Sequence, residues 1–351
     1  MNRISVNASG CYDVCIGAGL LQRLGAMMQP LVKGKTVAIV SDDNVWPLYG
    51  QTVENNLENA GFGPVYHFVI PAGEERKNGS TYLQLLSFLA QHQLTRSDCI
   101  LALGGGVVGD LAGFTAATYL RGIAYVQVPT TLLAAVDSSV GGKTAIDLPE
   151  GKNLAGAFYQ PALVVCDTNT LQTLPEDIFR DGCAEVIKYG ILYDEALFTH
   201  LAEKGLDFHR EQVITRCVEL KRDVVMADDF DTGARMRLNL GHTIGHGVEA
   251  QSNFTLSHGK AVAIGTAIVS RAGAACGICN ESTCDAILSV LEKFGLPCRT
   301  IYPAAEIYSC TLSDKKRSGG TINLIIPQRI GYCAICPTPI SELQEFIEVG
   351  L

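Results

Sequence analysis

Residues 101–114 read LALGGGVVGDLAGF, and they give the clearest indication of the fold. An apolar run leads into a glycine-rich turn with the spacing Gly104-x-Gly106-x-x-Gly109, and a helical pattern follows. Glycines let a backbone approach a pyrophosphate closely, and the N-terminus of the following helix favours negative charge. The stretch therefore predicts a strand, a phosphate-binding turn and a helix, although a tight turn that serves only packing has the same pattern.

Two features of this turn differ from the standard dinucleotide-binding fingerprint. The turn follows the third or fourth predicted strand instead of the first. No acidic residue stands about 20 positions further on, where a ribose partner is expected. Asp42, at the end of the earlier apolar run TVAIVSD, is a candidate ribose partner from a different position.

Short apolar runs alternate with helical patterns in the first half of the chain. The candidate strands are 35–42, 64–70, 99–104, 124–129 and 162–167. This alternation predicts a parallel sheet with helices on both faces, and the opening segments ISVNA and YDVCI predict a hairpin added to it. Later segments are nearly all helical, down to a strand candidate at 321–327. We expect an α/β fold, with a Rossmann-like parallel-sheet domain at 1–175, a mainly helical domain at 176–351 and a ligand-binding cleft between them.

The composition excludes several classes of protein. The chain has 351 residues, of which 47% are hydrophobic and 18% charged, as in globular proteins. A net charge of −9 argues against a nucleic-acid partner. We see neither an export signal nor a membrane span, so a cytoplasmic protein with reduced thiols is expected. The wide separation of the pairs Cys276/Cys279 and Cys333/Cys336 disfavours a structural zinc between them.

Residues 129–156 form an unusually polar segment, PTTLLAAVDSSVGGKTAIDLPEGKNLAG. Lys143 follows a glycine pair, and Lys152 and Asn153 follow Gly151. A lysine beside glycines is typical of phosphate binding, because the backbone approaches the anion while the ammonium meets its charge. The Walker spacing is absent, which disfavours nucleotide triphosphate hydrolysis. Solvated loops would account for both lysines equally well.

Three histidines lie close together in NLGHTIGHGVEAQSNFTLSHG, residues 239–259. His242 and His246 are four apart and share a helix face, and His258 follows. HTIGH lacks the glutamate of the HExxH protease motif. Glu185, with Lys188 one helical turn later, is a further candidate ligand. These residues indicate a metal site, but the residue pattern leaves the ligand set open.

Several long segments together resemble the 3-dehydroquinate synthase family over nearly the whole chain. They are GGGVVGDLAGF, RGIAYVQVPTTLLAAVDSSVGGKTAIDLPEGKNLAGAFYQP, GCAEVIKYG, and NLGHTIGH followed by LSHG. The resemblance implies a lyase of the shikimate pathway, and hence of aromatic amino acid biosynthesis. Its substrate would be the sugar-acid phosphate 3-deoxy-D-arabino-heptulosonate 7-phosphate, its products 3-dehydroquinate and phosphate, and its cofactors NAD and a divalent metal, zinc or cobalt.

Carried over position by position, the resemblance implies roles for individual residues. The metal ligands would be Glu185, His242 and His258, whereas His246 would face the substrate. The cofactor site would comprise Asp42, Gly73, Glu74, Lys77, Gly105, Gly106, Val107, Val108, Gly109, Asp110, Thr130, Thr131, Lys143, Lys152, Thr170, Leu171, Gln172 and Thr173. The catalytic and substrate-binding set would comprise Asp137, Lys143, Lys152, Asn153, Lys188, Lys221, Arg235, Asn239, His246 and, in the segment 314–316, Lys315 or alternatively Lys316.

Arg121 resembles the residue that reaches the neighbouring subunit's pocket, which implies a homodimer. The cofactor turn AGEERK departs from the family, where D-G-E is common at its start. Because Ala72 has no carboxylate, contact there would come from the backbone or from Glu74.

The implied reaction is a redox-neutral cyclisation. Hydride passes from a secondary alcohol of the substrate to NAD, phosphate leaves by β-elimination, and the hydride returns. Ring opening and an intramolecular aldol closure then complete the product. The lysines and Arg235 would hold the substrate phosphate and carboxylate in this acidic protein, and domain closure is expected on binding. The alternatives are a sugar-phosphate cyclase with another substrate, a metal-dependent polyol dehydrogenase, and a non-catalytic NAD-binding regulator.

Overall fold

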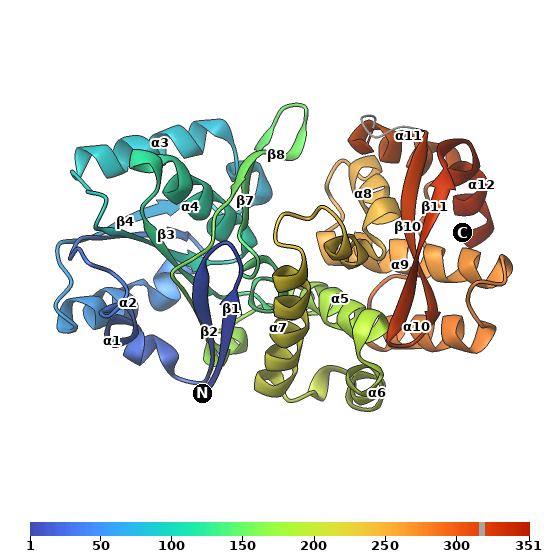
Figure 1. Ribbon diagram of the computed structural model, residues 1–351, viewed down its shortest axis with the longest axis horizontal. Helices are drawn as coiled ribbons and strands as arrows, with labels where there is room; N and C mark the ends of the chain where they lie inside the picture. The colour runs from blue at the N-terminus through green and yellow to red at the C-terminus, as the bar shows by residue number, and fades with distance from the viewer. Residues whose placement is uncertain (316–319) are drawn as a thin grey trace. The chain divides into compact units, whose positions relative to one another are not determined.

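The computed structural model describes residues 1–315 and 320–351, without the side chains of 313–315. By its internal contacts the chain divides into two compact units, one comprising residues 1–175 and 210–230, the other residues 176–209 and 231–351 (Figure 1). Among the described residues, no helix combines the length and the apolar character needed to cross a membrane.

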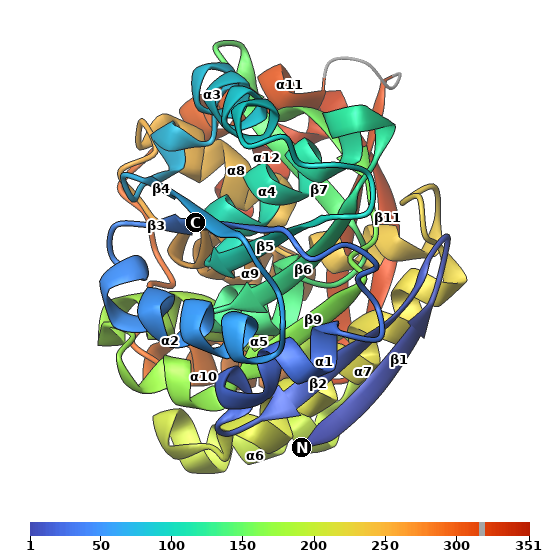
Figure 2. The ribbon, with the colours of Figure 1, turned by 90° about the vertical axis from the view of Figure 1, so that its left-hand side faces the viewer.

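The first unit is built on a seven-stranded sheet with the order β1-β2-β9-β6-β5-β3-β4, which can be followed across Figure 2. Its strands are β1 (Asn2–Asn7), β2 (Cys11–Gly17), β3 (Val37–Asp42), β4 (Val65–Ile70), β5 (Cys99–Gly104), β6 (Ala124–Pro129) and β9 (Leu163–Asp167). Only β1 is antiparallel to its neighbour; the other pairings are parallel. The expected parallel sheet with its opening hairpin is therefore confirmed.

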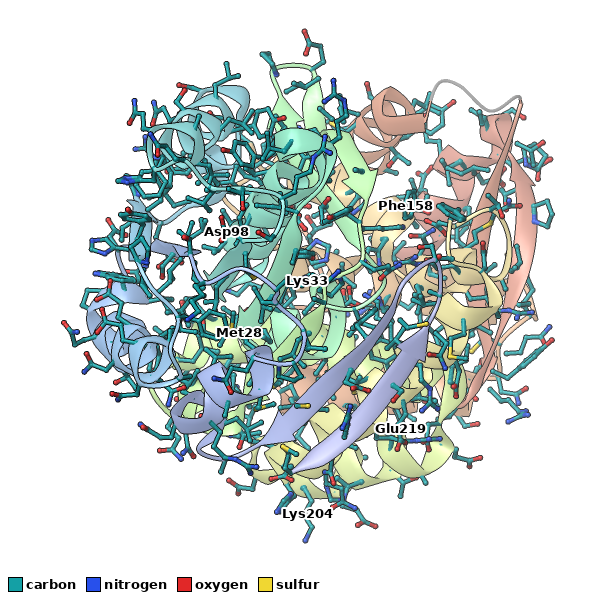
Figure 3. All side chains as sticks on the ribbon, turned by 60° about the vertical axis from the view of Figure 1, so that its left-hand side comes forward. Met28, Lys33, Asp98, Phe158, Lys204 and Glu219 are labelled. Atoms are coloured by element: carbon teal, nitrogen blue, oxygen red, sulfur yellow. The ribbon has the colours of Figure 1, made fainter. Side chains whose placement is uncertain are left out.

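Alternate side chains of the central strands enter two different apolar cores. Along β3, Val37 and Ile39 pack with α1 (Leu24–Met28) and α2 (Trp46–Asn59), and Met28 of this core is labelled in Figure 3. Ala38 and Val40 pack on the opposite face with α3 (Gly79–Gln91) and α4 (Gly106–Thr118). Strands covered on both faces need apolar residues at nearly every position, which explains the continuous apolar runs in the sequence.

The second half of the polar segment forms an antiparallel hairpin outside the main sheet. Its strands are β7 (Lys143–Leu148) and β8 (Gly151–Phe158). The hairpin extends as a narrow arm, green in Figure 1. The sequence pattern indicated loops here, because Gly, Lys and Asp residues interrupt any alternation of apolar and polar positions.

Helix α7 (Arg210–Ala227) belongs to the first unit, where it packs against β1, β2 and η4 (Ala134–Ser138). The position of α7 follows from these contacts, which a local helical pattern does not encode.

Helices dominate the second unit. They are α5 (Glu176–Tyr193), α6 (Glu195–Lys204), α8 (His242–Gln251), α9 (His258–Ala275), α10 (Glu281–Lys293), α11 (Ala304–Lys315) and α12 (Ile340–Gly350). Every residue from Ala261 to Ser270 of α9 is buried, as expected of a helix that others surround. The late strand is longer than expected, β10 (Thr321–Arg329), and pairs with a second one, β11 (Tyr332–Pro339).

The cysteines are unpaired and mostly buried. None of the thirteen forms a disulfide, and only Cys11, in the first unit, and Cys276, in the second, are exposed. Burial raises the pKa of several of these thiols, including Cys279 to about 11. Most of the thiols are therefore protonated and shielded, as small apolar core residues are.

Candidate functional site

Three helices of the second unit bring together a carboxylate and two imidazoles. Glu185 is on α5, His242 is the first residue of α8 and His258 is the first residue of α9. Glu185 Oε1 lies 3.4 Å from Nε2 of His242 and 3.4 Å from Nε2 of His258. Two donors at zinc-ligand distance from one tetrahedral ion stand roughly 3.3 Å apart. The donor atoms therefore have both the chemistry and the spacing that a divalent metal such as zinc requires.

Glycines allow the helices that carry these ligands to approach closely. A Cβ on Gly265 of α9 would lie 2.0 Å from the carbonyl oxygen of Gly241, the residue before α8. A Cβ on Gly259 would lie 2.0 Å from the carbonyl oxygen of Asp181 on α5. Real Cβ atoms do not approach oxygen so closely, so a side chain at either position would displace a ligand-bearing helix.

Asp181 joins α5 to the start of α9. Its Oδ1 accepts hydrogen bonds from Ser257 Oγ at 2.5 Å and from the backbone N–H of Lys260 at 3.1 Å. The first N–H groups of a helix have no partner within the helix, and negative charge is favourable beside them. Since Glu185 stands one turn after Asp181 on α5, the same helix positions one ligand and caps the helix that begins with another.

Hydrogen bonding fixes the orientation of His242. Its Nδ1 lies 3.0 Å from the carbonyl oxygen of Leu240, which can only accept, so Nδ1 carries the proton. The lone pair of Nε2 then points toward Glu185, as in metal-binding histidines. Burial, together with the nearby ammonium of Lys188, lowers the pKa of His242 and favours the neutral form that binds metals.

Two buried acids face His258. Glu185 contacts its Nε2, and Glu249 Oε2 lies 3.9 Å from its Nδ1. Burial lowers the pKa of His258, but the two carboxylates outweigh it and raise that pKa to about 10. Lys188, 2% exposed, forms an ion pair with Glu185. The two carboxylates give this position a negative potential, which favours the binding of a cation beside His258.

His246 takes part in a different donor group. His246, Glu249 and His258 also have ligand atoms within 4.8 Å of one another. The rings of His242 and His246 lie 5.6 Å apart, centroid to centroid. Within the described part of the chain, the donor groups contain either His242 or His246, so the three histidines do not form one ligand set.

Two further substrate-binding candidates of the second unit lie just before α8. Arg235, 3% exposed, and Asn239 are both on η7 (Ala234–Asn239). The expected contribution of 314–316, including Lys315 and Lys316, falls on side chains outside the described residues.

The glycine-rich turn of the first unit lies between β5 and α4, as expected. A Cβ on Gly109 would lie 2.7 Å from Gln127 Oε1, and one on Gly106 would lie 3.2 Å from Ser138 Oγ. The backbone N–H of Thr130 donates to Gly104 at 3.0 Å, which holds the end of β6 beside the turn. The first N–H groups of α4 therefore lie in a tight, glycine-lined corner suited to an anion.

Lys77 is the centre of a buried charge cluster. Its Nζ lies 2.9 Å from Glu74, 3.2 Å from Asp110 and 3.8 Å from Asp147, and it donates to Asn153 Oδ1 at 2.7 Å. Burial raises the pKa of Asp110 to about 6, although Lys77 opposes the shift. The cluster therefore joins the turn at Glu74–Lys77 to α4 and to the β7–β8 hairpin.

Asp42 and Tyr49 hold the two ends of a further part of the first unit, the start of α2 and its contact with residues 170–173. Asp42 Oδ1 accepts the N–H groups of Asn44 at 3.0 Å and Val45 at 2.9 Å, at the start of α2. The Tyr49 hydroxyl on α2 lies 2.5 Å from Thr173 Oγ1 and donates to the Thr170 carbonyl at 3.3 Å. Tyr49 thus ties α2 to η5 (Thr168–Gln172) and the residue after it.

Other candidates of the first unit lie on several elements. Asp137, on η4, pairs with Lys221 of α7 at 3.0 Å. Lys143 begins β7, and Lys152 lies on β8. Arg121, at the end of η3 (Tyr119–Arg121), is exposed and has a left-handed φ of 68°.

Comparison with known proteins agrees with the resemblance seen in the sequence. Models described as 3-dehydroquinate synthase N-terminal and C-terminal match residues 67–181 and 182–317. The 3-dehydroquinate synthase of Streptococcus suis (strain 05ZYH33) is 44% identical over 346 residues, which cover 96% of this chain and 97% of that protein. This chain belongs to the 3-dehydroquinate synthase family.

Solved structures of two other synthases share the fold of this 3-dehydroquinate synthase family member. A 2-deoxy-scyllo-inosose synthase complexed with carbaglucose-6-phosphate, NAD+ and Co2+ has a TM-score of 0.90 at 25% identity, over the whole of both chains. The 2-epi-5-epi-valiolone synthase ValA from Streptomyces hygroscopicus subsp. jinggangensis 5008, with NAD+ and Zn2+ bound, has a TM-score of 0.88 at 27% identity, covering 99% and 98% of the chains.

Several residues of this 3-dehydroquinate synthase family member were not selected from the sequence. They are Asp181, which caps the helix that begins with His258, and Glu249, Asp147 and Tyr49, which contact the candidate residues His258, Asn153 and Thr173. Glu249 lies within NLGHTIGHGVEAQ, and a carboxylate in a histidine-rich helix is the signal that could have selected it. Asp147 lies within the polar segment 129–156, but nothing there indicates that it accepts the N–H of Asn153. Asp181 and Tyr49 give no local signal, because their partners are distant in the sequence.

Proposed function

We propose that this chain is a 3-dehydroquinate synthase, a lyase that converts 3-deoxy-D-arabino-heptulosonate 7-phosphate to 3-dehydroquinate and phosphate. The observation that carries the proposal is the Glu185, His242 and His258 donor group in a chain that matches curated 3-dehydroquinate synthases over 96% of its length. The identity of 44% to such a synthase exceeds the 25% to an inosose synthase, which favours the carboxylate-bearing substrate.

The metal is assigned to Glu185, His242 and His258. The 3.4 Å spacing of the donor atoms and the hydrogen bond from His242 Nδ1 to Leu240 support this ligand set. Zinc or cobalt would, when bound, polarise a substrate hydroxyl and favour its oxidation. His246, which belongs to the other donor group, is assigned to the substrate.

NAD is assigned to the glycine-rich turn and its neighbours in the first unit. The N-terminus of α4 would receive the pyrophosphate, and Asp42 Oδ2 would face a ribose, since Oδ1 caps the start of α2. Lys77 and Asp110 would contact the cofactor from the buried charge cluster. Thr170–Thr173, held by Tyr49, would complete the site.

The substrate's anionic groups need several cations. In the first unit we assign Lys143, Lys152 and Lys221, with Asp137 holding Lys221 in place. In the second unit we assign Lys188 and Arg235, whose side chains are buried and hence fixed in orientation. Asn153 and Asn239 would add neutral hydrogen bonds.

We further propose a cytoplasmic homodimer in which Arg121 reaches the partner's pocket. The first test of this proposal is the mass of the particle in solution.

The proposal is tested by phosphate release from 3-deoxy-D-arabino-heptulosonate 7-phosphate with catalytic NAD, before and after chelation. Many turnovers for each NAD are expected, lost on chelation and restored by zinc. Glu185→Gln should remove both turnover and bound metal, whereas Glu203→Gln, on an exposed turn of α6, should change neither. Phosphate release only from sedoheptulose 7-phosphate would replace the proposal with another cyclase, and stoichiometric NADH would replace it with a dehydrogenase.

A further inference from the structure

The β7–β8 hairpin contains a wide irregularity at the residues assigned to the substrate. Its regular pairing ends at Ile146 opposite Ala155 and resumes at Leu148 opposite Gly151. One residue of β7, Asp147, therefore faces residues 152–154 of β8. Such bulges re-aim side chains and are common beside active sites. Here the bulge carries Lys152 and Asn153.

Asp147 supplies the hydrogen bond that the bulge removes from the ladder. Its Oδ1 accepts the backbone N–H of Asn153 at 2.8 Å. Asn153 has a left-handed φ of 56°, a conformation that costs energy for a residue other than glycine and needs support from its surroundings. The side-chain carbonyl of Asn153 is held from the other side, by Lys77 Nζ at 2.7 Å.

The backbone of Asp147 is itself anchored to the turn that carries Lys77. Its N–H donates to the carbonyl oxygen of Lys77 at 2.7 Å, and it forms an isolated bridge with Asn78. At the base of the hairpin, Phe158, labelled in Figure 3, packs edge-on against Phe230 with the ring centroids 5.4 Å apart. Asp147 therefore connects a fixed turn to the bulge.

We propose that Asp147 is a positioning residue that sets the conformation of Asn153 and thereby aims Lys152 and Asn153 at the substrate. The inference rests on the proposed function and adds a residue to it. Neutralising Lys77 is not the main role of Asp147, since Glu74 and Asp110 lie nearer to that ammonium, at 2.9 and 3.2 Å against 3.8 Å. What Asp147 alone provides is the acceptor for Asn153.

The test separates the acceptor from the charge. Asp147→Asn keeps an oxygen at the Oδ1 position, whereas Asp147→Ala removes it. Asp147→Ala should lower kcat/KM for the phosphate substrate about 10- to 100-fold, mainly through KM, because misplaced binding groups cost that much. Asp147→Asn should stay within about threefold of the unmodified enzyme. Glu150→Ala, at the exposed tip of the same hairpin, is the matched control and should change nothing.

NAD affinity is the second readout, measured by fluorescence titration of each variant. It should change less than about threefold in Asp147→Ala, since Lys77 keeps two nearer carboxylates. An equal loss of NAD and substrate affinity, or an equal loss in the Asn and Ala variants, would overturn the acceptor role.

A double-variant cycle completes the test. Asn153→Gly accepts a positive φ without strain and lacks the side chain that Asp147 helps to aim. In that background Asp147→Ala should reduce kcat/KM less than about threefold. Additive losses would show that Asp147 acts elsewhere. If the unmodified enzyme releases no phosphate, the proposed function is refuted, whatever the Asp147 variants show. Thermal unfolding of each variant identifies any that fail to fold.

Discussion

Asp181 lies beside the N-terminus of the helix that begins with His258, where its Oδ1 accepts the N–H of Lys260 at 3.1 Å. It stands one turn before Glu185 on α5, so a single helix both carries one candidate ligand and holds the helix of another. The relative position of Glu185 and His258 therefore depends on a residue outside the candidate donor group.

Replacing Asp181 by Ala should weaken metal binding without changing the ligands. The lost cap should lower the free energy of unfolding by about 0.5–2 kcal/mol. Metal affinity should fall roughly tenfold, as for residues that orient ligands. Chelator competition and thermal unfolding with and without zinc measure both effects. Asp177→Ala, at an exposed position earlier on α5, is the control, and an unchanged affinity in Asp181→Ala would refute the positioning role.

Replacing Gly265 by Ala should disturb the packing of α9 on α8. The added Cβ would meet the Gly241 carbonyl at 2.0 Å, which is backbone and has little room to move. We expect a loss of about 1–3 kcal/mol in the free energy of unfolding, measured by denaturant titration. Gly79→Ala, where a Cβ has no neighbour within 4 Å, should be nearly neutral, and equal effects of the two variants would contradict the packing argument.

Stability should respond to pH through Asp110. Burial raises the pKa of its folded form to about 6 from 3.8, so the folded state holds a proton that the unfolded state has lost between these values. Stability from this group is therefore present below about pH 4 and is lost as pH rises through 6. Asp110→Asn should be more stable than the unmodified protein at pH 8, by roughly 1–3 kcal/mol, and equal to it near pH 4. A difference that is constant with pH in paired thermal scans would contradict this.

Removing the Tyr49 hydroxyl should loosen the Thr170–Thr173 segment. Tyr49→Phe loses contacts with the Thr173 hydroxyl and the Thr170 carbonyl, worth about 0.5–1.5 kcal/mol. If this segment binds NAD, the dissociation constant should rise about 2- to 10-fold in a fluorescence titration. Tyr66→Phe is the matched control, because the Tyr66 ring stacks on His92, a contact that does not need the hydroxyl. Equal NAD affinity of the Tyr49 and Tyr66 variants would show that the Thr170–Thr173 segment does not contribute to NAD binding.

The sequence predicted the sheet well because its signals are local. Runs such as Cys99–Gly104 are apolar at consecutive positions, and a strand covered on both faces requires that pattern. The β7–β8 hairpin and β11 were not predicted from the sequence. Asp147, Lys152 and Asn153 are typical loop residues. Asp147 and Asn153 are held in the strand pair by contacts with Lys77, which is distant in the sequence.

The candidate site was only partly readable for the same reason. The histidine spacing indicated a metal, but counting residues did not choose between His242 and His246 as the partner of His258. The proposed choice of His242 rests on Glu185, from another helix, and on the carbonyl of Leu240, which orients one ring. Asp181 and Lys260 are 79 residues apart, and the local sequence around neither residue predicts their hydrogen bond.

The distribution of exposed thiols offers a practical consequence. Cys11 and Cys276 place one solvent-facing sulfur on each unit, while the partly exposed Cys310 and Cys336 can be exchanged for serine. A donor and an acceptor dye coupled to Cys11 and Cys276 would report the distance between these two residues by energy transfer. Energy transfer recorded before and after addition of NAD, zinc and substrate would then show whether the distance between the two units changes on binding.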